Sequence, residues 1–577
     1  MRLARRIALL LLLVVIVLGL FAGWQAYQLR QDLKRSEVAV NQLEAAVRSE
    51  DVAARNVAAK TLADDAASAA DRADGFVWGL VEHAPVYGDD ARAVTAISRS
   101  LDILASRAVQ PLLLTVDSMD GLTGGGRIDV DKLKSVQEPV QTARDAAVDA
   151  SATLEGVESA GLVGPVQRRY DEYVDRLDDL VDGLGAGERA LKVLPSVLGA
   201  DGPRDYLLVF QNNAEIRATG GIPGSWAQVH TDDGALQIVK QGTSGDFPNT
   251  AKEALPISAP ERAVYSKLFG IFWQDATFTP DWPRAADLLL QHWQKRYSPQ
   301  VLDGVVSIDP VAISYLLSST GGVTVDNVTL DAGNAVEQLL SAPYLQLTNT
   351  QQDEFFADAA RAIFETFTSE VTSPVDLVRG LARASAERRL LVSLSQGDEQ
   401  QLIAASAIAG KMPNRDVGTP RVFVGLSDAT ASKMSYYLRY EASVDPIGCV
   451  DDRQQMAGRV ELSQTISAEQ AAELPVLVTG PGDIGIPLGS QLVVIRLYTP
   501  TGGSVDDLTV AGKKVSLSPV NLDGRQVVTV VAQLSGPDEI SVTWTMTSGV
   551  GQTDDGLLLV TPGVVPGSAD STFSSTC

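Results

Sequence analysis

Cysteine, histidine and basic residues are scarce in this chain of 577 residues. Its two cysteines and three histidines are too few for a Cys/His zinc framework or an iron–sulfur protein. Its 47 Lys and Arg face 72 Asp and Glu, which gives a formal charge of −25. Nucleic-acid binding depends on clustered cations that neutralise phosphates. The composition therefore excludes these metal-cluster classes and argues against nucleic acid as a partner.

Several catalytic motifs are also missing. The sequence contains no G-x-S-x-G nucleophile elbow, no H-E-x-x-H helix and no Walker loop. A hydrophobic fraction of 45% with 21% charged residues is ordinary for folded proteins, so the chain is not globally disordered. Its length predicts several domains.

One long apolar run stands at the amino terminus. Three arginines among the first six residues precede Ile7–Ala22, and Trp24 and Tyr27 follow. The run from Ile7 to Trp24 is long enough to cross ~30 Å of hydrocarbon, and the aromatic residues suit the far interface. We expect residues 1–28 to form a cytoplasmic stub and a single-pass plasma-membrane anchor, with a large ectodomain outside. A cleaved signal peptide is the alternative, but its apolar core is usually shorter.

Three further regions follow the anchor. Residues 29–200 are rich in helix formers, with breaks at 83–90, 119–127 and 183–187, and predict an all-α helical bundle. Residues 201–412 alternate strands with helices and predict an α/β domain. Residues 413–561 carry β-branched, alternating segments that predict a β-sandwich, and 562–577 a flexible tail. The strands predicted from 201 onward are 206–210, 226–230, 236–239, 305–308, 436–444, 459–466, 491–498, 526–534 and 539–547, and the helices are 282–293, 311–317, 353–366 and 385–391.

The two cysteines are Cys449 and Cys577. Outside the cytoplasm a thiol pair tends to oxidise, so a disulfide between them is one expectation. Two unrelated thiols are the alternative. Neither has a histidine nearby in the sequence that could activate it as a nucleophile.

A polar, glycine-rich segment at 211–225 (QNNAEIRATGGIPGS) is the richest candidate site. Its amides, its single Arg and its glycine-freed backbone N–H groups could hold a phosphate or a sugar. A structural turn, with Arg and Glu paired, is the alternative. Asp275, Asp281 and Asp309 offer further carboxylates in turn or cap positions. The candidate ligand-binding residues are Asn212, Asn213, Glu215, Arg217, Gly220, Gly221 and Ser225, with Asp246 from the following GTSGD.

Four segments together resemble a known bacterial family of unknown function, DUF4012. They are DYLLVFQNNAEIRATGGIPGS, FTPDWPRAADLLLQHW, LDGVVSIDPVAISYLLSSTGGVTV and SKMSYYL. The resemblance implies an actinobacterial, membrane-anchored protein encoded near envelope-polysaccharide genes, and it brings no settled activity.

The order of these segments is also similar to that of the LytR–CpsA–Psr envelope enzymes, which transfer glycopolymers to peptidoglycan. This similarity implies a related α/β fold, with Arg217 as counterpart of the loop arginine and Asp246 of the aspartate after the third strand. The later arginines that hold the pyrophosphate have no counterpart in residues 344–356. A divalent metal would be expected only in such an enzyme; otherwise no cofactor is expected.

Three functions follow as hypotheses. The first is an anchored envelope protein that binds an envelope glycan or lipid-linked polymer, or assists its assembly. The second is a LytR–CpsA–Psr-like phosphotransferase that attaches glycopolymer to the cell wall. The third is a non-catalytic envelope scaffold.

Overall fold

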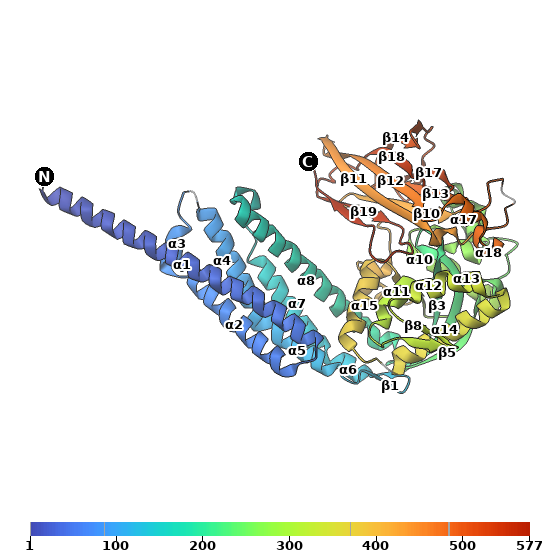
Figure 1. The fold of residues 1–577 in the computed structure, drawn as a ribbon, viewed down its shortest axis with the longest axis horizontal. Helices are drawn as coiled ribbons and strands as arrows, with labels where there is room; N and C mark the ends of the chain where they lie inside the picture. The colour runs from blue at the N-terminus through green and yellow to red at the C-terminus, as the bar shows by residue number, and fades with distance from the viewer. Residues whose placement is uncertain (1, 86, 370, 483–484) are drawn as a thin grey trace. The chain divides into compact units, whose positions relative to one another are not determined.

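A computed structural model describes residues 2–85, 87–369, 371–482 and 485–577, with side chains from Phe21 onward except that of Ala22. The chain divides into two compact units. The helical unit comprises residues 1–122 and 129–195, and the sheet unit comprises residues 123–128 and 196–577 (Figure 1).

The helical unit is built from α-helices that are packed through small side chains. Alanines supply much of its buried surface, among them Ala66, Ala69, Ala143 and Ala146, none of which is exposed. Small side chains let helix axes approach closely, so an alanine-rich sequence can build a core without aromatic residues. The helices are α1 Arg2–Arg48, α2 Val52–Ala73, α3 Phe76–Val81, α4 Gly88–Ile103, the π-helical turn η1 Leu104–Ala108, α5 Val109–Ser118, α6 Val130–Ser135, α7 Gln137–Ala152, the short η2 Ser159–Gly161 and α8 Gly164–Val197.

One predicted break in this unit is wrong. Helix α8 runs without interruption through residues 183–187, although three glycines stand there. Gly185 is buried, and only its own helix neighbour Arg189 lies close to the position of a Cβ. A glycine costs a helix about 1 kcal/mol, which packing of the helix face can offset.

The predicted anchor from Ile7 to Trp24 belongs to α1. Its side chains up to Leu20, and that of Ala22, lie outside the described ones. Among the residues whose placement the structure describes, no helix combines the length and apolarity that a membrane crossing needs.

The sheet unit begins with a seven-stranded sheet in the order β1-β2-β5-β4-β3-β6-β9. Strands β3 and β6 are parallel and the other neighbours are antiparallel. Two further strands, β7 and β8, form a separate ribbon. The bounds are β1 Thr123–Gly124, β2 Arg127–Ile128, β3 Arg204–Arg217, β4 Gly220–Asp232, β5 Ala235–Thr243, β6 Gly304–Ile308, β7 Val323–Val325, β8 Val328–Leu330 and β9 Leu390–Leu394.

Helices accompany this sheet and make the region an α/β mixture, as expected. Four tryptophans and three phenylalanines are buried in one aromatic core beside helix α10, where the rings of Phe247 and Trp273 stack at 3.8 Å. The helices are α9 Ala259–Tyr265, α10 Trp282–Tyr297, α11 Pro310–Leu317, α12 Ala335–Leu340, α13 Ala342–Gln346, α14 Asn349–Ser369, α15 Pro374–Ala386 and α16 Gly397–Ile403, with the 3-10 turns η3 Ser244–Asp246, η4 Lys267–Gly270, η5 Trp273–Phe278 and η6 Ala407–Ala409.

Two predictions in this region are wrong. Residues 211–225 form no open loop, because they continue β3 and begin β4. A Cβ on Gly221 would lie 2.3 Å from the backbone of Asn212, so the glycine permits the strands to close on each other. The segment 385–391 is also no helix: α15 ends at Ala386 and β9 begins at Leu390.

Two more sheets enclose a second core. A six-stranded sheet, β16-β17-β13-β10-β19-β20, faces a five-stranded sheet, β11-β12-β18-β14-β15, across buried aliphatic side chains (Figure 1). The bounds are β10 Arg421–Asp428, β11 Leu438–Val450, β12 Arg453–Gln464, β13 Gln491–Tyr498, β14 Ser504–Val510, β15 Lys513–Lys514, β16 Val520–Leu522, β17 Arg525–Leu534, β18 Ile540–Thr547, β19 Gly556–Val560 and β20 Ser571–Phe573, with η7 Met434–Tyr436, α17 Ala468–Ala472 and α18 Val476–Thr479 between strands.

The six-stranded sheet is shared by both cores of the sheet unit. Phe423 and Tyr498 point into the aromatic core, whereas their strand neighbours Val422 and Leu497 point into the aliphatic core. Ile216, near the tip of the β3–β4 hairpin, also lies in the aliphatic core. The α/β region and the two sheets therefore pack as one compact unit.

The segment predicted as a flexible tail is paired with the body of the unit. β20 pairs with β19, and Cys577 forms a disulfide with Cys449 of β11. Arg388 and Arg389 add side-chain contacts to residues between β19 and β20. Composition alone suggested mobility because glycine, serine and proline have little side-chain surface to bury. Here backbone groups, the Asp570 carboxylate and the Cys577 disulfide supply the contacts instead.

Candidate functional site

The carboxyl ends of the parallel strands β3 and β6 bring polar side chains together. Asn213 lies near the end of β3, and Asp309 follows β6 directly. Asp309 caps helix α11, because its Oδ1 accepts from the N–H of Ala312 at 2.7 Å. Its Oδ2 accepts from Asn213 Nδ2 at 2.9 Å. Ligands of α/β proteins commonly bind at this edge of a sheet, so the cluster is a natural candidate.

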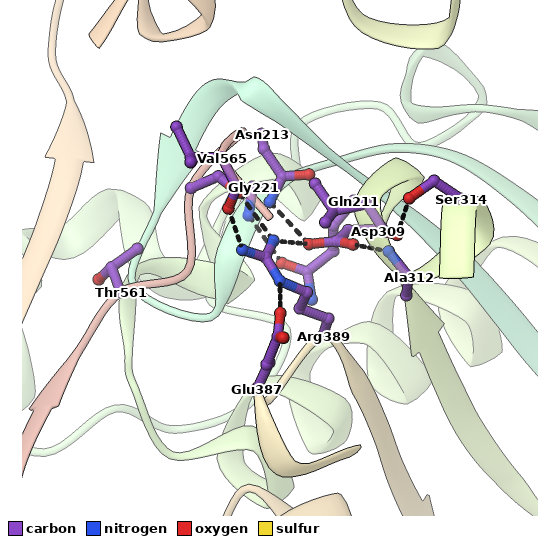
Figure 2. Close-up of polar contacts among 12 residues, drawn as sticks. Gln211, Asn213, Gly221, Asp309, Ala312, Ser314, Glu387, Arg389, Thr561 and Val565 are labelled. Atoms are coloured by element: carbon purple, nitrogen blue, oxygen red, sulfur yellow. Dashed lines mark hydrogen bonds and ion pairs between the residues drawn. The ribbon is translucent and has the colours of Figure 1, made fainter. Parts of the chain in front are cut away.

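Arg389 is the centre of this cluster, as Figure 2 shows. It precedes β9, which runs antiparallel to β6 and therefore starts at the same edge. Arg389 Nη1 donates to Asp309 Oδ2 at 2.9 Å, and Nε donates to Glu387 Oε2 at 2.8 Å. The side chain is only 1% exposed.

Backbone carbonyls of the C-terminal segment complete the shell of Arg389. Nη1 also donates to the carbonyl of Gly563 at 2.7 Å, and Nη2 donates to those of Val565 at 2.7 Å and Gly567 at 3.0 Å. A guanidinium has five N–H groups, and each of them has an acceptor here. In this conformation Arg389 has no N–H group left for a ligand.

The charges of the cluster are matched within the protein. Burial raises the pKa of Asp309, and the nearby Arg389 opposes that rise. For Glu387, hydrogen bonds from Tyr315, Arg383 and Arg389 outweigh burial and lower the pKa. Burial lowers the pKa of Arg389, but Asp309 and Glu387 outweigh it, so the pKa is raised and the guanidinium is ionised. The arrangement can clamp the C-terminal segment, and it offers no exposed group for proton transfer.

A second buried network surrounds the tip of the β3–β4 hairpin. Glu215 accepts from Arg217 Nη2 at 2.9 Å and from Lys433 Nζ at 2.6 Å. Arg217 Nη1 also donates to the carbonyl of Asp428 at 3.1 Å. Burial raises the pKa of Glu215, but Lys433 and Arg217 outweigh it and lower the pKa. The Arg–Glu pair is thus part of the packing of the hairpin against β10 and η7.

The other residues of the predicted site have separate places. Asn212 donates to Tyr344 Oη at 2.5 Å. Gln211, which the sequence interpretation left out, accepts from the N–H of Gly221 at 2.9 Å and positions the hairpin next to Gly220. Ser225 pairs with Thr243 in the ladder of β4 and β5. Asp246 Oδ2 accepts from the N–H of Thr243 at 2.9 Å, in a capping box of the turn η3.

Arg217 and Asp246 therefore belong to different hydrogen-bond networks. Three further carboxylates, Asp275, Asp281 and Asp309, are also dispersed, and burial raises the pKa of the first two to about 6. Among the residues that the structure describes, no group of three or more His, Cys, Asp or Glu side chains is placed to hold a metal ion.

A groove of about 350 Å³ lies on the five-stranded sheet. Two rows of residues cross four strands there, in register. One row is Asp445, Ala457, Thr545 and Asp507, and the other includes Arg459, Thr543 and Thr509. Along their strands, the residues of these two rows alternate with residues whose side chains are buried in the core, namely Val460, Val542 and Leu508. Both rows therefore lie on the outer face of the sheet.

Small side chains form the floor of the groove, and polar groups surround that floor. Thr509 and Thr543 share a hydrogen bond of 2.6 Å between their hydroxyls. Arg459 is 58% exposed and lies 3.3 Å from Glu461. Lys514 donates to Asp507 at 3.1 Å, and this contact lowers the pKa of Asp507. Hydroxyl, carboxylate and guanidinium groups thus face solvent in one hollow.

Sequence reasoning missed both Arg389 and this groove. The acidic and basic residues Glu387, Arg388 and Arg389 directly before a hydrophobic strand were a signal for the first. The alternation of threonines in VTWTMT, residues 542–547, was a signal for a polar outer face. Neither signal identifies its partners, which come from other strands.

Residues 201–344 match the model of a family described as protein of unknown function (DUF4012). The matched region runs from β3 to α13, and so includes the β3–β4 hairpin and Asp309. No curated protein and no solved structure matches the chain.

Proposed function

We propose that this chain, whose residues 201–344 belong to the family DUF4012, is a membrane-anchored extracytoplasmic protein that binds a cell-envelope glycopolymer and assists its assembly. The single observation that carries the binding role is the groove on the five-stranded sheet. Its volume of about 350 Å³ is within the range of small-ligand sites.

The accessible lining of the groove is mostly apolar, but the polar groups around it suit a ligand with hydroxyl groups. Threonine hydroxyls both donate and accept, Asp445 and Asp507 accept, and Arg459 donates. Four strands at a spacing of about 4.8 Å give the rows a length of roughly 14 Å, so an extended chain could lie across them. No large apolar side chain projects from the two rows described above, which disfavours a protein partner, since protein interfaces usually have an apolar core.

The location outside the cytoplasm has independent support. Cys449 and Cys577 are joined by a disulfide, and disulfides persist mainly in oxidising compartments. The apolar run from Ile7 to Trp24 fits a plasma-membrane anchor with the amino terminus in the cytoplasm. An actinobacterial origin would agree with this assignment.

The phosphotransferase alternative has less support. This alternative rests on the sequence resemblance to the LytR–CpsA–Psr enzymes. However, Arg217 is paired with Glu215, and Asp246 caps a turn in another network. A pyrophosphate donor needs several converging cations, and these two residues do not converge. A divalent metal is therefore not part of the proposal, and fold similarity alone does not imply activity.

The experiment is a calorimetric titration of the full chain in detergent with neutral oligosaccharides released from the envelope. We expect Thr543→Val to weaken binding about two- to tenfold, because a neutral hydrogen bond contributes about 0.5–1.5 kcal/mol. Arg459→Ala should weaken it further, because bonds from a charged donor contribute about 1.5–3 kcal/mol. Lys513→Ala is the matched control, since Lys513 is exposed on the same sheet and does not line the groove.

Two results would reject the groove. One is binding by Arg459→Ala and Thr543→Val at the affinity of the unmodified chain. The other is no heat of binding from any envelope oligosaccharide, in which case the scaffold hypothesis becomes the better account.

A further inference from the structure

Large apolar side chains are exposed near one end of the helical unit. Trp24 and Tyr27 on α1 are 50% and 57% exposed, and Phe76 on α3 is 82% exposed. Leu80 of α3 is 49% exposed, and Tyr87, just before α4, is 60% exposed. We call these five residues the aromatic end.

The short helix α3 is firmly packed, so its exposed residues are held in place. Trp78 lies in a core cluster with Leu29 of α1, and its indole N–H donates to Thr95 at 3.0 Å. Because Trp78 points inward, Phe76 and Leu80, each two residues away, point to solvent. A packed helix that nevertheless exposes large apolar side chains indicates a binding surface.

Helix α3 lies beside the part of α1 where the apolar run ends. A Cβ placed on Gly75 would lie 3.8 Å from Gln25 Oε1, so α3 begins level with Gln25. Gln25 directly follows Trp24, where the apolar run of α1 ends. Figure 1 shows α3 beside α1 where α1 extends beyond the other helices towards the amino terminus.

The turn into α8 belongs to the same end. The N–H of Val163 donates to Asp90 Oδ1 of α4 at 2.9 Å, and Val163 is 41% exposed. Asp90 is three residues from Tyr87. Segments from α1, α3, α4 and α8 thus contribute apolar surface near the end of the predicted membrane span.

We propose that the aromatic end rests in the headgroup layer of the membrane, as a second contact beside the anchor. This inference depends on the proposed anchoring of α1. Tryptophan and tyrosine prefer the membrane–water interface, where the ring is apolar and its polar atom remains hydrated. Phe76 and Leu80 enter the boundary of the acyl chains, as the apolar face of an interfacial helix does.

Two arginines near this end are paired with aspartates and are therefore not free to bind anionic lipid. Arg92 pairs with Asp89, and Arg99 pairs with Asp74 at 2.6 Å. The contact is therefore made by apolar side chains and forms on zwitterionic phosphatidylcholine. Added salt leaves it unchanged, because screening acts on charges.

The test uses nitroxide labels on the full chain in phosphatidylcholine vesicles. Leu80→Cys places the label on the aromatic end, and Leu114→Cys on α5 is the matched control, since Leu114 is 57% exposed in the same unit. Labelling without reductant leaves the Cys449–Cys577 disulfide unreactive. Collision of each label with a water-soluble nickel chelate is measured by electron paramagnetic resonance. The label at position 80 should collide several-fold less often than the label at position 114, in low and in high salt.

Flotation of the same vesicles after alkaline washing separates the two proposals. A chain that stays with the vesicles while both labels collide equally would overturn the aromatic end and leave the anchor standing. A chain that is washed off would overturn both. Should the Leu80→Cys protein fail to fold, amide hydrogen exchange of the unmodified chain replaces it: residues 76–82 should exchange more slowly in vesicles than in detergent, and equal exchange would overturn the inference.

Discussion

Replacing Arg389 with methionine should destabilise the sheet unit strongly. The substitution removes five hydrogen bonds and leaves Asp309 and Glu387 without their shared cation. Removing one partner of a buried ion pair costs about 3–5 kcal/mol, and each buried acceptor left unpaired adds about 1–3 kcal/mol. Glu387 keeps the hydrogen bond from Arg383, which moderates the loss. We expect a decrease of about 5 kcal/mol in the free energy of unfolding.

Urea unfolding followed by tryptophan fluorescence measures this loss, because the four tryptophans of the aromatic core report on the sheet unit. Adding Asp309→Asn to Arg389→Met should restore part of the stability, since asparagine keeps the cap of α11 but carries no charge. Arg379→Met, at an arginine that is 51% exposed, is the matched control and should stay within about 0.5 kcal/mol of the unmodified chain. An Arg389→Met protein that unfolds within about 1 kcal/mol of the unmodified chain would refute the reasoning.

Three further predictions concern the same unit. Burial raises the pKa of Asp275 to about 6, so ionisation of this carboxyl destabilises the fold as pH rises from about 4 to about 6. Asp275→Asn should therefore stabilise the protein by up to about 2–3 kcal/mol at about pH 8 and by little at about pH 4. Urea titrations at both pH values measure the difference. Cys577→Ser should cost about 2–4 kcal/mol, and dithiothreitol should destabilise only the unmodified protein in melting experiments. Ile216→Ala should cost about 2–5 kcal/mol and speed amide exchange at the hairpin tip, whereas unchanged exchange would contradict its place in the core.

Local patterns in the sequence were sufficient for many elements. Pro283 stands in the first turn of α10, as its position suggested, and Asp309 caps α11, whereas Asp281 makes no side-chain cap bond to α10. Alternating and β-branched segments identified β13, β17 and β18. These features depend on neighbours within one turn or one strand, and so a single sequence contains them.

The candidate site depended on contacts that local patterns do not carry. Gly220 has φ +132°, and Gly221 has no room for a Cβ; both glycines serve a tight hairpin, where a ligand loop was expected. Arg389 meets Asp309 at a separation of 80 residues and the carbonyl of Gly563 at 174. A polar residue looks the same in the sequence whether its partner is a ligand or a distant segment of the chain.

The most direct test of the proposed function is a structure of the full chain with a bound envelope oligosaccharide. The proposal predicts sugar density across the outer face of the five-stranded sheet, with hydroxyls within hydrogen-bond distance of Thr543 and Arg459. Density at the β3–β4 hairpin beside Arg217, or an empty groove at saturating oligosaccharide, would contradict it.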